Sequence, residues 1–528
     1  MRERCEVAIV GAGPVGLVLA ILLARRGWRT AVLERWPRPY PLPRAVHFDH
    51  ETGRIFQAAG VADEVRALCD PACTSEWRNA AGETLLAFGR EGVASLSGWP
   101  GSNMFHQPDL ERVLERRLRA LDCGALRRGV EVFELEPRAR GVRVRARDAA
   151  GEVSELEADW LVGCDGANSA VRRSMHVPVE DLGLEADWLI VDLLLRRERR
   201  FRPKNWLLCD PARPVTAISG GPGRRRFELM RLPHESVEAL HEPRTAWELL
   251  APFDLSPADA LIERQAVYSF RARWAESWRA GRLLIAGDAA HLLPPLAGQG
   301  LSSGLRDAAT LAWQLDLVLA RRAPEALLAT YGAERLPHVR SLIAVSIDLG
   351  RLFCVTDREE ALARDAHLAA LRRANERSPL PSPPRMGQGT TLAGDRYAGE
   401  LFVQGRVAAR VWGVPRTGLF DDVVGRGWAL VGADRDPADD LTPEQRRFFG
   451  SLGGVSAHVG PDAPVVDVDG RYAAFFARTG RRVALQRPDF HLFGTGKDPA
   501  GAGELVSALA RQLAAPSSVG ADEGQLDR

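Results

Sequence analysis

The chain begins with an alternation of apolar runs and glycines. Residues 5–10 form a short apolar run of the kind that a buried parallel strand shows. Glycines interrupt the pattern from 11 to 16, and residues 15–26 are then predicted as a helix that ends at Gly27, a residue type common at helix C-termini. Residues 30–34 form a second apolar run. This order predicts a βαβ unit at the start of a doubly wound sheet.

Further periodic segments follow. An amphipathic helix is predicted over 108–121 and alternating strands over 129–162. Residues 185–270 show strand-like alternation and are predicted as a sheet inserted into the first domain. Residues 282–287 are predicted as a buried strand and 300–320 as a long helix, and a mainly helical region is predicted over 323–376.

Domain boundaries follow from these patterns and from one proline-rich stretch. A chain of 528 residues exceeds the roughly 250–300 residues that a single core supports, so several domains are expected. Prolines crowd residues 378–384 and indicate a stiff linker. The predicted class is α/β. A discontinuous Rossmann-like nucleotide-binding domain is predicted over 1–180 and 271–376, with a mainly β domain inserted over 181–270. A linker over 377–388, a small α/β domain over 389–515 and a disordered tail over 516–528 are predicted to follow.

Composition restricts the partners and the compartment. The formal net charge of +1 gives no long-range attraction to nucleic acid or to an anionic membrane. The N-terminal apolar run is broken by glycines, and no later run reaches about 18 apolar residues, so neither a signal segment nor a membrane span is expected. Of seven scattered cysteines only Cys69 and Cys73 lie close together, which predicts reduced thiols in a cytoplasmic protein without a zinc site.

The first motif is Gly11-x-Gly13-x-x-Gly16, with Glu34 at the end of the next strand. Gly11 permits a tight turn, Gly13 lets the backbone approach a pyrophosphate, and Gly16 lets the helix lie close to the strand. The helix N-terminus offers N–H groups to phosphates, and the acid accepts hydrogen bonds from a ribose. The pattern predicts dinucleotide binding, with a glycine-rich helix–strand contact as the alternative. Alone it does not separate FAD from NAD.

A second motif, Asp165-Gly166 with Ser169 and Arg172 beyond it, follows another apolar strand. Taken alone it favours a structural interpretation, in which Asp165 or Ser169 caps a helix.

The third motif runs from Gly287 to Asp307. Asp288 follows a buried strand, where it can bind a hydroxyl of a sugar-like chain, and two prolines stiffen the backbone beyond it. Gly298-Gln-Gly300 then opens a long helix, whose positive end stabilises negative charge of the kind that builds up on a reduced flavin ring. His291 is interpreted as a histidine that packs this turn.

In this order the three motifs resemble those of the FAD-dependent aromatic hydroxylases, the group A flavoprotein monooxygenases, over roughly residues 5–350. Within the group the chain is most similar to the 3-(3-hydroxyphenyl)propionate hydroxylase branch, through residues 43–46, 105–111, 209–214 and 298–307. The C-terminal domain resembles the thioredoxin-like domain of phenol hydroxylase relatives. It has no Cys-x-x-Cys motif, because the last cysteine is Cys354, so a redox role is not expected there.

The resemblance implies a role for each motif residue. The residues expected to bind the ADP half of FAD are Gly11, Gly13, Gly16, Glu34 and Arg35, and those expected on its flavin side are Arg44 and Gln107. Asp165 and Gly166 are expected to take part in both FAD and nicotinamide binding, and Asp288 is expected to bind the ribityl chain. The residues expected to line the isoalloxazine ring are Pro295, Gly298, Gln299, Gly300 and Leu301.

The resemblance also implies the reaction. NADH or NADPH reduces FAD, oxygen adds to give a C4a-hydroperoxide, and an oxygen atom passes to a ring carbon ortho or para to a phenolic hydroxyl. No second G-x-G-x-x-G is evident, so the nicotinamide is expected to visit a groove. His47 and Tyr268 are candidates for contact with the phenol, and packing in the core is the alternative for both.

Other functions stay open at this point. The motifs describe the flavin site and not the substrate pocket, so a tailoring hydroxylase for a larger polyketide or antibiotic is an alternative to a hydroxylase of 3-(3-hydroxyphenyl)propionate-like substrates. A halogenase or a Baeyer–Villiger-type oxygenase would keep the fold, but Trp274 and Trp278 do not supply the Trp-x-Trp-x-Ile-Pro segment of tryptophan-type halogenases. A non-catalytic flavin-binding protein would be expected to lose Asp288 or the glycines near the ring. A homodimer is expected by analogy.

Overall fold

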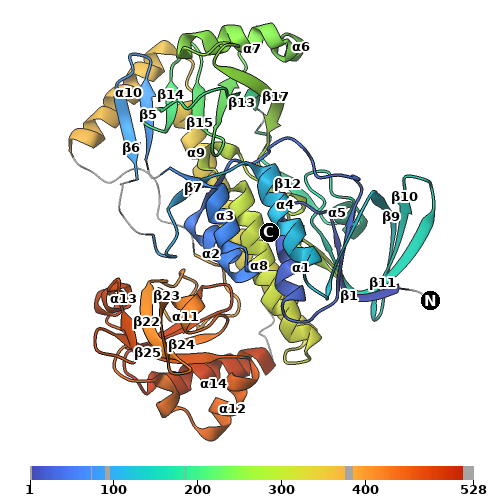
Figure 1. Cartoon of the computed structure of the whole chain (residues 1–528), viewed down its shortest axis with the longest axis vertical. Coiled ribbons are helices and arrows are strands. Elements are labelled where there is room, and N and C mark those ends of the chain that lie inside the picture. Colours follow the sequence, from blue (N-terminus) through green and yellow to red (C-terminus); the bar gives the residue numbers. More distant parts are fainter. Residues whose placement is uncertain (1–2, 73, 90–94, 185, 375–384, 515–528) are drawn as a thin grey trace, which may run out of the picture.

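The computed structural model describes residues 3–72, 74–89, 95–184, 186–374 and 385–514, which form three lobes (Figure 1). One lobe holds the N-terminal βαβ unit, the upper lobe holds a second sheet, and the lower lobe is the C-terminal domain. The predicted tail and most of the predicted linker lie outside the described residues. Within the described part, no helix is long and apolar enough to cross a membrane.

The first sheet has the doubly wound arrangement that the sequence predicts. Its strand order is β19-β20-β11-β1-β2-β8, with β10 beside β11 and β9 beside β10. Strand β1 pairs in parallel with β2 and with β11, and β11 pairs in parallel with β20. The strands are β1 Glu3–Val10, β2 Thr30–Glu34, β8 Gly124–Arg128, β9 Val130–Arg138, β10 Gly141–Asp148, β11 Val153–Gly163, β19 Arg279–Ala280 and β20 Leu283–Ile285.

Helices cover this sheet. Helix α1 is apolar on all sides and almost entirely buried, because it packs against both α4 and α8. The helices predicted over 15–26, 108–121 and 300–320 are present as α1, α4 and α8, with ends shifted by at most two residues. The helices of this domain are α1 Pro14–Ala24, α2 His50–Ala59, α3 Ala62–Leu68, α4 Gln107–Arg119, α5 Ala170–Met175, α8 Gly300–Leu319 and α9 Ala329–Phe353. Helix α10 Arg358–Arg373 lies instead against the sheet of the upper lobe (Figure 1).

The upper lobe is built on a seven-stranded sheet with the order β17-β13-β16-β15-β14-β5-β6. Its strands are β5 Ser75–Asn79, β6 Thr84–Phe88, β13 Ala186–Leu195, β14 Asn205–Cys209, β15 Val215–Ser219, β16 Arg224–Met230 and β17 Ala260–Phe270. Two of them, β5 and β6, lie within the 1–180 segment that the sequence assigned wholly to the nucleotide-binding domain, so that boundary was wrong. Strand β5 pairs in parallel with β14, a long-range pairing that local sequence patterns do not encode.

The lower lobe confirms the predicted C-terminal α/β domain. Its sheet has the order β23-β22-β26-β25-β24-β27-β28, in which β24 and β25 are parallel and β27 and β28 antiparallel. Its elements are β22 Arg406–Val411, β23 Val414–Leu419, α11 Phe420–Val423, β24 Ala429–Gly432, α12 Pro443–Ser451, β25 Val455–Gly460, β26 Val465–Asp467, α13 Arg471–Thr479, β27 Val483–Gln486, β28 Leu492–Gly496 and α14 Gly501–Ala514.

Buried ion pairs attach the lower lobe to the first domain. Arg487 lies 2.6 Å from Glu334 of α9 and 2.6 Å from Asp489, and at most 2% of each side chain is exposed. Arg54 of α2 binds Asp421 at 2.7 Å, again with both side chains buried. Buried pairs of this kind impose a defined geometry, because an unpaired charge in such surroundings is costly. The two lobes are therefore held in one arrangement.

Candidate functional site

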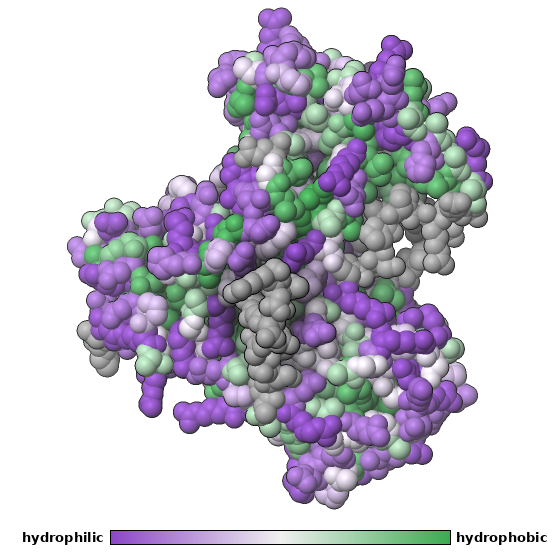
Figure 2. Space-filling view, turned by 180° about the vertical axis from the view of Figure 1, so that it is seen from behind, coloured by the Kyte–Doolittle hydropathy of each residue, from purple (hydrophilic) through white to green (hydrophobic). Residues whose placement is uncertain are grey.

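All three sequence motifs meet at one cavity of about 1120 Å³. This volume exceeds the roughly 300–1,000 Å³ of common ligand pockets, so a large cofactor fits beside a small substrate. The predicted site residues that line the cavity are Gly13, Arg44, His47, Gln107, Gly166, Tyr268, Asp288, Pro295, Gly298, Gln299, Gly300 and Leu301. Seen from behind, the outer surface is mainly hydrophilic, with apolar groups gathered on the upper lobe (Figure 2).

Glycines of the motifs fall into two kinds. A Cβ atom at Gly11 would lie 2.3 Å from the carbonyl oxygen of Cys164, and one at Gly16 would lie 2.1 Å from that of Gly11. The protein's own packing therefore requires both. At Gly13 the nearest atom would be the flexible end of Arg44 at 3.8 Å, and at Gly300 nothing lies within 4 Å. These two glycines face the cavity and leave room for a ligand at the starts of α1 and α8.

Asp288 is a carboxylate without a protein partner. It lies in a short 3-10 turn just after β20, is exposed and lines the cavity. Among the described residues no group donates a hydrogen bond to it. A carboxylate in this position can accept hydrogen bonds from ligand hydroxyls, as the sequence predicts for the ribityl chain.

Gln107 supports the loop that carries Arg44. Its amide oxygen accepts hydrogen bonds from the backbone N–H groups of Arg44 and Ala45, at 3.2 and 2.7 Å, and its NH2 group donates to Glu111 at 2.7 Å. Burial raises the pKa of Glu111. The arrangement gives Gln107 a role in shaping the cavity wall, and its predicted contact with a flavin stays a prediction.

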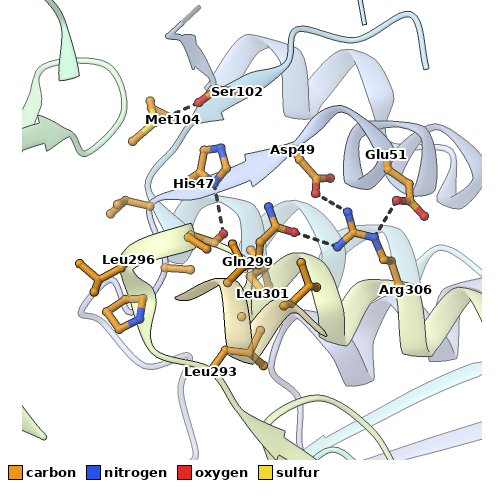
Figure 3. Close-up of a pocket in the computed structure, with 18 of the residues that line it drawn as sticks. His47, Asp49, Glu51, Ser102, Met104, Leu293, Leu296, Gln299, Leu301 and Arg306 are labelled. Atoms are coloured by element: carbon orange, nitrogen blue, oxygen red, sulfur yellow. Dashed lines mark hydrogen bonds and ion pairs between the residues drawn. The ribbon is translucent and has the colours of Figure 1, made fainter. Parts of the chain in front are cut away.

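His47 reaches the start of α8. Its Nδ1 lies 3.2 Å from the carbonyl oxygen of Gly298, and burial lowers its pKa (Figure 3). Because a carbonyl oxygen only accepts, Nδ1 carries the hydrogen in this contact and Nε2 is left as an acceptor. A neutral imidazole with a free acceptor suits a general base.

Besides Gly11 and Gly16, three predicted cofactor residues do not line the cavity. Glu34 accepts hydrogen bonds from the N–H groups of Ala12 and Trp36, at 2.8 and 3.0 Å, so it supports the glycine turn from behind. Arg35 stacks on Trp36. Asp165 accepts hydrogen bonds from two backbone N–H groups at the start of α5, which is the helix-capping interpretation. Their contacts with a cofactor stay predictions.

His291 packs the third motif, as expected. It lies 2.7 Å from Asp307, which also binds Arg335 at 2.9 Å and accepts a hydrogen bond from the backbone N–H of Gly287 at 3.0 Å. All of this network is buried. It fixes the turn that presents Asp288 to the cavity.

Comparison with known proteins decides the family. The family model described as "FAD binding domain" matches residues 4–346, and the one described as "HcaD C-terminal domain" matches residues 399–512. Both cover the lobes that form the cavity. Curated aromatic-ring hydroxylases are 36–37% identical to this chain along more than nine-tenths of its length. The chain belongs to the FAD-dependent aromatic hydroxylases. This hydroxylase binds FAD. The free carboxylate of Asp288 and the open space at Gly13 and Gly300 fit that cofactor, and binding of FAD in this cavity stays a prediction.

Curated relatives extend along the whole hydroxylase. A "Probable NADH-specific resorcinol 4-hydroxylase" of Rhodococcus jostii is 37% identical over 519 residues and covers 96% of each chain. A "3-(3-hydroxy-phenyl)propionate/3-hydroxycinnamic acid hydroxylase 2" of Burkholderia vietnamiensis is 36% identical over 517 residues, covering 92% of this chain and 93% of the relative. The chain is thus an enzyme that hydroxylates phenolic rings with FAD, and a purely flavin-binding or a large-substrate tailoring role is not favoured.

Solved structures agree in fold. The flavin-dependent monooxygenase PieE, in complex with FAD and substrate, matches with a TM-score of 0.79 at 22% identity, covering 97% of this chain and 99% of that one. Aklavinone-11 hydroxylase, in a ternary complex with FAD and aklavinone, matches with a TM-score of 0.76 at 25% identity, covering 97% and 100%. The predicted arrangement of an FAD-binding domain, a β-rich domain and a C-terminal α/β domain is confirmed.

One wall of the hydroxylase cavity was missed by sequence reasoning. Thr216, Glu228 and Ile190 are direct neighbours across β15, β16 and β13, and all three line the cavity. The Thr216 hydroxyl is buried without a hydrogen-bond partner in the described part of the chain. The carboxyl of Glu228 lies 3.9 Å from Arg226 and also interacts electrostatically with Asp192 and Arg264. Charged residues at every second position of β16 were the available signal, since they mark a polar face on an otherwise apolar strand.

The neighbouring row of side chains on the same sheet is charged, and most of its polar atoms have hydrogen-bond partners. Arg226 binds Asp192 at 2.7 Å and donates to the carbonyl oxygens of Pro43 and Arg44. Arg264 also donates to Pro43 and lies over the ring of Tyr268. The upper sheet therefore holds the Arg44 loop against the FAD cavity. Tyr268 lines that cavity as well, and its contact with a phenol stays a prediction.

Replacing Glu228 with glutamine is expected to make stability less dependent on pH. Burial raises the folded-state pKa of Glu228 above its ordinary value of 4.5, although Arg226 opposes the shift. As pH rises from about 4.5 to that raised pKa, the folded chain is forced to take up a buried negative charge, so the free energy of unfolding falls across this pH range. The variant removes this penalty, and each 1 kcal/mol regained raises the melting temperature by about 2–4 °C.

The measurement is the melting temperature of both proteins between pH 4 and 8. The two curves should meet near pH 4 and separate as pH rises, with Glu228→Gln the more stable. Parallel curves across the whole range would contradict a raised pKa at this position.

Proposed function

We propose that this hydroxylase acts on a small phenol that carries a second ring hydroxyl, as resorcinol does, and that it uses NADH and O2. The observation that supports the substrate is the pair formed by Glu228 and Thr216 on the upper sheet. Both face the cavity, and no partner satisfies the Thr216 hydroxyl within the described chain. A carboxyl group accepts a hydrogen bond from a hydroxyl whether or not it is ionised, so the pair suits a neutral, hydroxylated ring.

Residues of the chain divide the remaining work. The chemistry that bound FAD supplies is hydride acceptance from the nicotinamide and activation of oxygen. His47, through Nε2, accepts the proton of the phenol that directs hydroxylation. Glu228 and Thr216 orient the second hydroxyl. Apolar side chains of the wall exclude water from the ring: Trp77, Phe88, Ile190, Leu207, Phe270, Leu342 and Leu349.

A second candidate substrate carries a carboxylate, as 3-(3-hydroxyphenyl)propionate does. One observation favours it: Nε of Arg264 is buried without a hydrogen-bond partner in the described part of the chain, and this residue lines the cavity. The nearby carboxyl of Glu228 opposes it through like charge. Names of the curated relatives include both substrate types, and NADH follows the name of the Rhodococcus relative.

Substrate assays separate the two candidates. We expect NADH to be oxidised faster than NADPH, and resorcinol to give about one hydroxylated product per NADH, with matching oxygen uptake. Replacing Glu228 with leucine should lower kcat/KM for resorcinol about 10- to 100-fold, the value of one strong hydrogen bond. It should not lower kcat/KM for 3-(3-hydroxyphenyl)propionate.

Glu263→Leu serves as the matched control, because Glu263 pairs with Arg224 on the same sheet and is not part of the cavity wall. Tighter coupling and higher kcat/KM with 3-(3-hydroxyphenyl)propionate would support the second candidate. Peroxide as the only product would mean that neither is the substrate. A homodimer and a cytoplasmic location stay predictions.

A further inference from the structure

Gln299 stands at the start of α8 and is held there by Arg306, which also lines the cavity (Figure 3). Nη1 of Arg306 donates to the amide oxygen of Gln299 at 3.0 Å. The same guanidinium binds Glu51 through Nε at 2.6 Å and Asp49 through Nη2. Only 8% of Arg306 is exposed. A single buried arginine therefore fixes three side chains.

This contact determines which end of the Gln299 amide faces the cavity. A guanidinium has five donors and no acceptor, so it can only bind the amide oxygen. The NH2 group then points away from Arg306. Within the described chain, no residue accepts a hydrogen bond from that NH2 group. Gln299 thus presents an unused donor at the cavity wall.

The charges around Arg306 make the arrangement persistent. Burial alone would raise the pKa of Asp49, but Arg306 and neighbouring groups hold it well below its ordinary value. The pKa of Arg306 is raised by the same two carboxylates, against the effect of burial. Asp49 and Arg306 therefore both stay ionised at neutral pH, and their ion pair holds Arg306 beside Gln299.

The lower lobe supports the cluster from the other side. Helix α2 carries Glu51 and, one turn later, Arg54, whose guanidinium binds Asp421 of α11. His491 lies 3.8 Å from Glu51. The C-terminal domain thereby fixes the helix that supplies one of the two carboxylates.

We propose that Arg306 is a positioning residue that orients Gln299 so that its NH2 group donates to the acceptor-rich edge of the flavin ring. That edge gains negative charge on reduction, so a fixed donor there stabilises reduced FAD more than oxidised FAD. The inference rests on FAD binding in this cavity and not on the identity of the phenol. The third motif would then act on the flavin through a side-chain network as well as through the backbone at the start of α8. That network is supported by the C-terminal domain.

Midpoint potentials of bound FAD test the proposal, with the FAD affinity of the apoprotein as a second readout. Gln299→Leu removes the donor and should weaken reduced relative to oxidised FAD about tenfold, which lowers the potential by about 30 mV. Arg306→Lys keeps the charge between Asp49 and Glu51 but lacks the fork that reaches Gln299. It should give a similar decrease, and the double variant should fall no further than either single variant.

Gln299→Glu keeps Arg306 paired and the fold intact, so it answers the question even where Arg306→Lys fails to fold. It replaces the donor by an acceptor and should lower the potential more than Gln299→Leu. The matched control is Gln314→Leu, on the same helix but bonded to Thr330 outside the cavity, which should leave the potential unchanged.

Additive effects of the two single variants, or a Gln299→Glu potential equal to that of the unaltered enzyme, would overturn the proposal. Failure of the unaltered chain to bind FAD would instead overturn the flavin site itself.

Discussion

Replacing Gly13 with valine is expected to give a folded protein that no longer holds FAD. The backbone at Gly13 is extended, with φ −72° and ψ 175°, a conformation open to any residue. A Cβ atom there meets only the end of Arg44 at 3.8 Å, so the fold has room for it. The added methyl groups occupy the space before α1 where a pyrophosphate would lie. We expect FAD affinity to fall at least about 100-fold, or about 2.7 kcal/mol.

The measurement is FAD titration of the apoprotein, followed by flavin fluorescence, with circular dichroism to check the fold. Gly450→Val, at an exposed position of α12 with nothing within 4 Å, is the matched control and should bind FAD normally. Gly11→Ala should behave differently from both, because its Cβ would lie 2.3 Å from a carbonyl oxygen and the fold itself should fail. Normal FAD binding by Gly13→Val would show that the phosphates lie elsewhere.

Replacing Arg487 with methionine is expected to destabilise the C-terminal domain by about 3–5 kcal/mol. The change leaves Glu334 and Asp489 buried without their cation, since both lie 2.6 Å from Arg487 and are at most 2% exposed. Asp489 keeps its hydrogen bond from Trp313 at 2.9 Å, which compensates only part of the loss. The pKa of Asp489, lowered to about 2 mainly by Arg487 against the effect of burial, should rise in the variant.

Hydrogen exchange at the amides of β24 and β27 measures this loss. Protection should fall by a factor of about 100 to several thousand, because each 1.4 kcal/mol is a factor of ten. The same substitution at Arg482, whose pair with Asp434 is about half exposed, is the control and should cost less than about 1 kcal/mol. An equal loss of protection in the two variants would mean that the buried ion pairs of Arg487 stabilise this lobe no more than an exposed pair does.

Local sequence patterns were sufficient for much of the fold. The βαβ unit could be predicted because an apolar strand, a glycine turn and a helix ending in glycine are encoded by neighbouring residues. Strands β5 and β6 could not be assigned correctly, because β6 pairs only with β5 among the described strands, and β5 joins the sheet through β14, more than a hundred residues away. Only Trp77 of β5 is fully buried, so the strand gives no strong apolar signal of its own.

The site shows the same contrast between residues in local motifs, which could be predicted, and residues brought together by long-range pairing, which could not. Glycines and Asp288 belong to dense motifs, and the structure brings most of them to one cavity. Thr216, Glu228 and Arg306 were missed as site residues, because their role depends on which sheet face or helix side meets the cavity. Glu34 carries a ribose signature, and its carboxylate also accepts hydrogen bonds from the backbone N–H groups of Ala12 and Trp36, a supporting role that the motif did not predict.

The exchange of strands between the first two lobes has a consequence for synthesis on the ribosome. The upper sheet needs β5 and β17, and the first sheet needs β20, which ends at Ile285. The upper sheet cannot close before β17 ends at Phe270, and the first sheet cannot close before β20 ends at Ile285. Closing both sheets needs about 285 residues to be made, which takes about 15–60 s at 5–20 residues per second. Through that interval the buried end of β11, residues 161–163, lacks its partner strand β20 on one side. Nascent chains of this length are therefore the species that chaperones must protect from aggregation.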